Sequence, residues 1–247
     1  MKKLLLTVLC TVALCLQALA QDFPRCILAG DYADPSIMRE GKDFYMTHSM
    51  FNYNPGFLIW HSQDLVNWEP VCRVATKQLS NAWAPELFKL KGKYYLYYPS
   101  NKKIWMCSSD NIAGPWTAPR EVEGSEGIDP GHITDDQGNR YLFVNKGRMA
   151  RLNAEGTALT EPLKTVHKGW DIPKNWVTEG KWPEKYLESP KLIRHNGYYY
   201  LTSAEGGTAG PATSHMIVSA RAKSLEGPWE ESPYNPIVHT YSATDNW

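Results

Sequence analysis

Three carboxylates in this chain stand in a recurring sequence pattern whose residue types could carry acid–base chemistry. Asp34 and Asp129 each directly precede a proline, and Glu188 precedes one by two residues. After each proline come an apolar run, a glycine turn and an aromatic segment. If such repeats are arranged around an axis, equivalent positions face each other across it, and the three acids meet in one pocket.

The distance from each acid to the glycine of its turn supports the repeat. Asp129 lies nine residues before Gly138, and Glu188 lies nine residues before Gly197. The interval from Asp34 is slightly shorter, at seven residues. A fourth copy places an aromatic residue at this position, because Trp83 lies nine residues before the glycine at 92. Three carboxylates and one tryptophan are therefore expected at equivalent places.

Hydrolysis of a glycosidic bond needs carboxylates in unequal states. One is ionised to activate water, and another stays protonated to donate to the leaving oxygen. A third negative charge can keep the donor protonated, since like charges disfavour ionisation. Glu179 and Glu184 are rival donors, but only Glu188 has the nine-residue interval to a turn glycine. Glu86 lies three residues beyond the equivalent position and is expected to be structural.

The elements that would position these residues are short strands. The turn glycines fall at 41, 92, 138 and 197, so the repeats are 46 to 59 residues apart. Each repeat offers about four runs of strand-forming residues between Gly, Pro, Asn and Asp turns. No useful helical periodicity appears after the N-terminal segment. This pattern predicts an all-β fold, a β-propeller with about four blades in this chain.

The N-terminal segment and the charge limit the location and partners of the protein. Residues 1–20 have a Lys-Lys start, an apolar stretch and a small-x-small site ending at Ala20, which predicts a secretory signal peptide cleaved there. The propeller would then occupy 21–247 of a secreted or periplasmic protein with no membrane span. Without Lys2 and Lys3, 24 basic residues face 26 acidic ones. This balance gives no electrostatic case for nucleic-acid binding.

The order and spacing of these motifs resemble glycoside hydrolase family 43, over roughly 25–247. The resemblance rests on five segments: ADPSI at 33–37, WAPE at 83–86, IDPGHITDDQG at 128–138, ESPKLIRHNGYYYL at 188–201 and AEGGT at 204–208. Membership implies a five-bladed propeller and inverting hydrolysis that releases arabinofuranose or xylose from plant-type carbohydrates.

The resemblance also assigns roles to individual residues. It implies that Asp34 is the general base, that Glu188 is the general acid, and that Asp129 tunes the pKa of the acid and orients it. Trp83 would contact the sugar. His48 and His215 are further candidates for the substrate pocket. No cofactor is required by this reading, and a calcium ion at the centre is compatible with the family although the chain has no calcium-binding loop.

Two features depart from the family pattern. The acid is followed by Ser189 and a proline, where the family usually has Gly-Pro. The segment for the fifth blade, which normally carries a Gly-His-Gly sequence, is absent. The chain is therefore expected to be either a fragment or a four-bladed remnant, with an incomplete catalytic domain of poor stability or low activity. A non-catalytic sugar-binding propeller and a retaining, invertase-like glycosidase with Asp34 as nucleophile stay open as alternatives.

Overall fold

A computed structural model describes residues 26–51, 53, 55–75, 81–173, 185–206 and 216–239. The chain divides into two compact units, 1–31 and 32–247. The described part of the first unit, 26–31, has irregular backbone, and the predicted signal peptide lies outside the described residues. All strands belong to the second unit. Within the described ranges, no helix has the length and apolarity needed to cross a membrane.

The second unit consists of four antiparallel sheets, each made of four strands that follow one another in sequence. We call these sheets blades one to four. Blades one and two contain β1 (Ser36–Glu40), β2 (Asp43–Thr47), β3 (Gly56–Ser62), β4 (Glu69–Ala75), β5 (Glu86–Leu90), β6 (Lys93–Ser100), β7 (Lys103–Ser109) and β8 (Arg120–Glu121). Blades three and four contain β9 (Gly131–Thr134), β10 (Arg140–Val144), β11 (Arg148–Arg151), β12 (Lys164–Thr165), β13 (Glu188–His195), β14 (Tyr198–Glu205), β15 (Met216–Ala222) and β16 (Glu230–Glu231).

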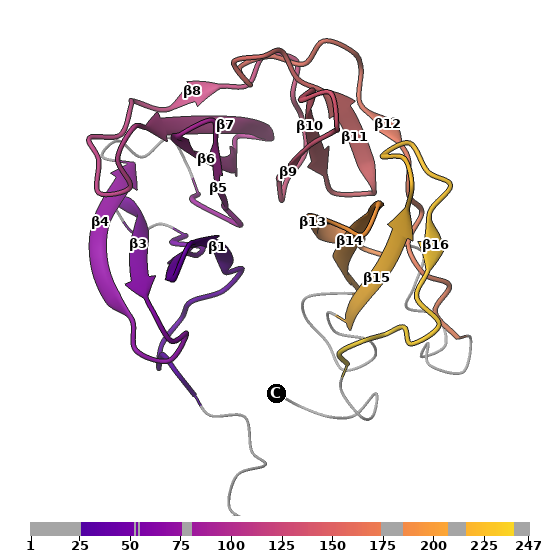
Figure 1. Cartoon of the computed structure of the whole chain (residues 1–247), viewed down its shortest axis with the longest axis horizontal. Helices are drawn as coiled ribbons and strands as arrows, with labels where there is room; N and C mark the ends of the chain where they lie inside the picture. Colours follow the sequence, from indigo (N-terminus) through magenta and orange to yellow (C-terminus); the bar gives the residue numbers. More distant parts are fainter. Residues whose placement is uncertain are drawn as a thin grey trace, which may run out of the picture. The chain divides into compact units, whose positions relative to one another are not determined.

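The first strand of every blade lies innermost, so that β1, β5, β9 and β13 surround a common axis within this unit (Figure 1). Consecutive inner strands contact each other, β1 with β5, β5 with β9 and β9 with β13. The all-β propeller with about four blades that the sequence predicts is confirmed. The predicted hairpin turns are also in place, with the glycines at 41, 92, 138 and 197 between the first two strands of each blade.

The hydrophobic core is divided among the spaces between consecutive blades. Three clusters of buried residues lie between blades one and two, two and three, and three and four, and they include Phe57 with Leu96, Tyr97 with Leu142, and Phe143 with Tyr199. The opposite face of blade four carries Ile193 and Ile217, which are 65% and 39% exposed, and no strand of the described chain covers it. Alternate residues of a strand point to opposite faces, which is why one sheet has one buried face and one open face.

The chain enters each inner strand through the same unusual backbone conformation. The residue before the entry proline has a positive φ in all four blades, +53° at Asp34, +28° at Ala84, +56° at Asp129 and +49° at Ser189. This left-handed region is uncommon for residues other than glycine, and aspartate tolerates it better than most. The repeated geometry makes these four residues structurally equivalent to one another.

This equivalence corrects the alignment expected from the turn glycines. In the structure Ser189, not Glu188, is the counterpart of Asp129, and Glu188 lies one residue earlier. The counts of nine agreed because the hairpin of blade three has a longer turn. Five residues separate β9 from β10, whereas only two, Asn196 and Gly197, separate β13 from β14. A longer turn moves its glycine away from the axis without moving the residue at the strand entrance.

Candidate active site

Asp34 is fixed at the entrance of blade one by a serine that follows the second strand of the same blade. The Oγ of Ser49 donates a hydrogen bond to Oδ2 of Asp34, and the Ser49 backbone N–H donates to the carbonyl of Ala33 at 2.9 Å. The same Oγ accepts a hydrogen bond from the backbone N–H of Ala84 at 2.7 Å. Ser49 therefore fixes the orientation of the Asp34 carboxylate and joins the entrances of blades one and two.

Asp129 is the buried carboxylate of the site, with only 8% of its surface exposed. Its Oδ2 accepts hydrogen bonds from the backbone N–H of Ser189 at 3.1 Å and from the Ser189 Oγ at 3.4 Å. Burial, followed by the negative charges of Glu188 and Asp34, raises the pKa of Asp129 to about 6. The Ser189 N–H and the Lys191 ammonium act in the opposite direction. Asp129 can thus change its protonation state near neutral pH.

Asp34 and Asp129 share one cavity of about 360 Å³ at the axis. The residues that line it come from all four blades and are Asp34, Pro35, Ala84, Pro85, Asp129, Ser189, Lys191, Thr202, Ser203, Ala204 and Ile217. The inner strands deliver them because every entrance opens toward the axis. The structure therefore brings together two of the three predicted carboxylates in a single hollow.

Glu188 lies beside this cavity rather than in its lining. It is the first residue of β13, pairs with Ala204 of β14, and precedes an irregularity in the register between Glu188 and Lys191. A neighbouring cavity of about 330 Å³ is lined by Asn145, Lys146, Thr165, Lys168, Lys185, Tyr186, Leu187 and Glu188. Five of these residues, from Thr165 to Leu187, belong to the part of the chain between β11 and β13. Glu188 nevertheless lies close enough to Asp129 for its charge to raise the pKa of that residue.

The remaining predicted site residues have different surroundings. Trp83 is 38% exposed, and neither it nor His48 belongs to the described lining of the two cavities. His48 is only 2% exposed, accepts a hydrogen bond from Trp60 at 3.1 Å, and has its Nδ1 2.8 Å from the carbonyl of Ser49. His215 and the two rival donors lie outside the described residues. In the part of the chain that the structure covers, no three His, Cys, Asp or Glu side chains are grouped as metal ligands would be.

Sequence reasoning missed several residues that shape the site. Ser189 could have been found by aligning the four prolines instead of the four glycines, because it stands where the other blades have Asp34, Ala84 and Asp129. Ser49 follows an inner hairpin and carries no motif of its own. Lys191, which lines the cavity, was likewise missed, and no local signal points to it. The three described cysteines, Cys26, Cys72 and Cys107, are all free.

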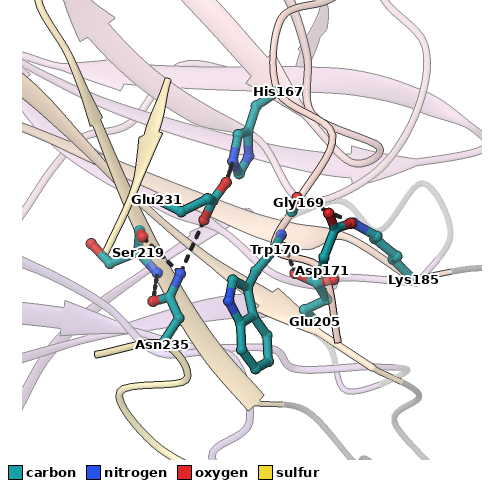
Figure 2. Close-up of polar contacts among 9 residues, drawn as sticks. All are labelled: His167, Gly169, Trp170, Asp171, Lys185, Glu205, Ser219, Glu231 and Asn235. Carbon is teal, nitrogen blue, oxygen red and sulfur yellow. Dashed lines mark hydrogen bonds and ion pairs between the residues drawn. The ribbon is translucent and has the colours of Figure 1, made fainter. Parts of the chain in front are cut away.

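A buried glutamate anchors the loop that flanks the Glu188 cavity (Figure 2). Glu205 is fully buried at the end of β14, and its Oε2 accepts a hydrogen bond from the backbone N–H of Trp170 at 2.9 Å. Gly169 packs closely against this carboxyl group, since a Cβ at that position would lie 3.0 Å from its Oε2. Lys185 donates to the carbonyl of Gly169 at 3.2 Å and pairs with Asp171 at 2.8 Å. The loop is thereby tied to blade four.

A second group of contacts in Figure 2 continues this attachment along blade four. The Nε2 of His167 lies 2.6 Å from Oε1 of Glu231, and Asn235 donates to the other oxygen of Glu231 at 3.0 Å. Asn235 also exchanges two hydrogen bonds with the backbone of Ser219 on β15, at 2.8 and 3.0 Å. The segment before Gly169 is therefore fixed to β16 and β15, and the segment after it is fixed to β14.

Replacing Glu205 with Gln is expected to flatten the pH dependence of the free energy of unfolding. Burial is the main cause that raises the pKa of Glu205 from 4.5 to about 7. The folded protein thus retains a proton that the unfolded chain releases, and the resulting stability is complete below pH 4.5 and lost as pH rises through about 7. That change corresponds to at most roughly 3 kcal/mol.

Urea unfolding at pH 5 and pH 8 measures this contribution. Glu205→Gln keeps an oxygen that can accept a hydrogen bond from the Trp170 N–H, but it has no carboxyl proton to lose. We therefore expect the free energy of unfolding to differ less between the two pH values in this variant. The control is Glu226→Gln, which removes an exposed glutamate paired with Lys164 and should leave the difference unchanged. An unaltered difference in the Glu205 variant would contradict the prediction.

Comparisons with known proteins agree with this architecture. A family model described as glycosyl hydrolases family 43 matches residues 23–247. A β-xylosidase of Bacillus subtilis (strain 168) is 33% identical over 241 residues, covering 89% of this chain and 44% of the relative. A non-reducing-end α-L-arabinofuranosidase of Bacteroides ovatus is 31% identical over 244 residues, covering 91% and 43%. A solved family 43 structure from Bacillus licheniformis superposes with a TM-score of 0.74 at 30% identity, covering 87% and 44%. The chain spans less than half the length of these relatives.

Proposed function

The chain belongs to glycosyl hydrolase family 43, and from this membership we propose that it is an inverting glycosidase that releases arabinofuranose or xylose from plant-type polysaccharides or oligosaccharides. The observation that carries the proposal is the shared cavity of Asp34 and Asp129 at the propeller axis, with the charge of Glu188 acting on Asp129. A cavity of about 360 Å³ is large enough to hold one pentose unit.

The three carboxylates take different parts in the proposed reaction. Asp34 is the general base, which removes a proton from water as the water oxygen attacks the anomeric carbon. Glu188 is the general acid, which gives its proton to the glycosidic oxygen as the bond between carbon and that oxygen breaks. Asp129 orients the acid and adjusts its ionisation through their mutual repulsion. The product sugar has the opposite anomeric configuration because water attacks from the face opposite the leaving group.

The proposed arrangement is supported by the environment of each carboxylate. Asp34 is exposed to the cavity and is oriented by Ser49, as suits a group that must reach a water molecule. Asp129 is buried, so its interaction with Glu188 is weakly screened by solvent. Glu188 belongs to a second cavity, which we propose accepts the leaving-group side of the substrate. The lysines and the tyrosine of that cavity offer hydrogen-bond donors to sugar hydroxyl groups.

Secretion is part of the proposal and rests on the predicted signal peptide at 1–20. Outside the cell or in the periplasm, the protein would meet its carbohydrate substrate directly. The proposed partners are therefore glycans alone, and the charge balance supplies no reason to add nucleic acid.

Hydrolysis of p-nitrophenyl α-L-arabinofuranoside and p-nitrophenyl β-D-xyloside tests the proposed function. We expect release of nitrophenol from at least one of them, and proton NMR of the first product of xyloside cleavage is expected to show the α-anomer. Appearance of the β-anomer first would instead indicate a retaining enzyme with Asp34 as nucleophile. Binding of xylo-oligosaccharides by calorimetry without any turnover would indicate a carbohydrate-binding propeller and would overturn the proposal.

A further inference from the structure

One layer below the carboxylates, the four blades place four residues at another set of equivalent positions. Each directly follows the entry proline, and each pairs with a residue of the second strand of its own blade. These residues are Ser36, Glu86, Gly131 and Lys191. Three carry polar side chains directed into the centre of the unit, as their mutual hydrogen bonds show. The layer is thus a floor beneath the shared cavity.

Polar contacts across the axis connect this floor. Lys191 Nζ donates to Oε2 of Glu86 at 2.5 Å and to the carbonyl of Pro85 at 3.3 Å. The hydroxyl of Ser36 donates to the same Glu86 oxygen at 3.2 Å. Glu86 is only 8% exposed, so its carboxylate is shielded from solvent. One carboxylate of blade two is therefore bound from blade one by Ser36 and from blade four by Lys191.

Blade three contributes a glycine to this layer because no side chain fits there. A Cβ on Gly131 would lie 2.2 Å from the carbonyl oxygen of Pro190, which is a backbone atom and cannot rotate away. Blades three and four consequently approach each other closely. Lys191, the residue after this proline, extends to blade two rather than to blade three.

The ammonium of Lys191 also belongs to the candidate site. Lys191 lines the same cavity as Asp34 and Asp129, and it follows by two residues the serine whose N–H binds Asp129. The charged groups that act on Asp129 are Glu188, Asp34 and Lys191, and Lys191 is the only cation among them. Glu86 stands behind this cation and partly neutralises it.

We propose that Lys191 is a positioning residue of the candidate site: Glu86 holds its ammonium across the axis, where it balances the negative charges of Asp34, Asp129 and Glu188. The inference deepens the proposed function and rests on it for the role of Asp129 in hydrolysis. The ammonium keeps Asp129 ionised to lower pH than burial alone would allow, because it is the one positive charge that opposes two neighbouring carboxylates.

The test is a carbon-13 NMR titration of the Asp129 carboxyl group in the full chain, with its signal assigned from an Asp129→Asn sample. Lys191→Met removes the positive charge at nearly constant length and is expected to raise the titration midpoint by about one pH unit. Glu86→Gln keeps an oxygen that can accept from Lys191 but removes the negative charge behind it, and is expected to lower the midpoint. The control is Lys89→Met, which breaks a lysine–glutamate pair with Glu40 outside both described cavities.

Opposite movements in the two variants, with no movement in the control, would support the proposal. A midpoint that is unchanged in Lys191→Met, or that moves in the same direction in both variants, would overturn it and leave Lys191 with a structural role. Hydrolysis by the unmodified chain is measured separately from the titration. Opposite movements in a chain without turnover would support the placement of Lys191 and count against the proposed function. If the chain is active, the acid-side midpoint in the pH profile of kcat/KM should move to higher pH in the Lys191→Met variant.

Discussion

Asp34→Asn is expected to reduce kcat/KM by about 100- to 10,000-fold on every glycoside tested, whereas Glu188→Gln should reduce it by that factor mainly on substrates with poor leaving groups. A general base acts on the attacking water, so its loss affects all substrates alike. A general acid acts on the departing oxygen, so its loss matters less when that oxygen leaves readily as an anion. p-Nitrophenolate is such a leaving group, and the oxygen of xylobiose is not.

The measurement compares the two variants on p-nitrophenyl β-D-xyloside and on xylobiose. Asp110→Asn is the control, since this carboxylate is exposed, with 88% side-chain accessibility, and lies outside both cavities. Equal losses on both substrates for Glu188→Gln would assign the acid to another residue. In that case Glu179 and Glu184, the rival donors, are the next residues to replace.

Gly131→Ala is expected to destabilise the protein by about 3 kcal/mol or more. The added Cβ would lie 2.2 Å from the carbonyl oxygen of Pro190, and only a backbone displacement between β9 and β13 can relieve that contact. Because Gly131 is two residues from Asp129, the displacement should also disturb the hydrogen bond between Ser189 and Asp129.

Urea unfolding of the variant and of a matched control tests this prediction. Gly56→Ala places the same methyl group in a strand where it would meet the Cβ atoms of Ala82 and Ala75 at 3.7 and 3.8 Å, which is ordinary van der Waals contact. A change of less than about 0.5 kcal/mol is expected there. Similar losses in the two variants would show that blades three and four do not approach as closely as the structure indicates.

The sequence predicted the blades because their signals are local. A glycine turn, an alternating aromatic strand and a proline at the strand entrance each depend on the backbone preferences of a few neighbouring residues. Repetition of these signals four times was enough to predict a propeller and to place Asp34 and Asp129 at its axis. For Trp83, His48 and His215, a role in substrate binding was predicted only from the family resemblance. No local rule says which side chains enter a pocket.

The alignment of Glu188 shows where local counting failed. The interval to the turn glycine depends on the length of the hairpin, and the hairpin of blade three is longer than that of blade four. The strand entrance, which is fixed by the axis, is the better reference. Only the folded chain shows that Ser189 occupies the place of the acid in blade four and that Glu188 lies at a second cavity.

The sequence by itself therefore determined the class of fold and about four blades, and it predicted that three carboxylates meet at the axis, of which Asp34 and Asp129 line one cavity there. Only the tertiary structure decided which groups surround them. The Ser49 hydroxyl, which orients Asp34, also binds the N–H of Ala84 in blade two across 35 positions in the chain, and Lys191 of blade four reaches Glu86 of blade two across 105. Contacts of this range arise when separate blades pack around one axis, so that the environment of each carboxylate depends on residues that no local pattern connects.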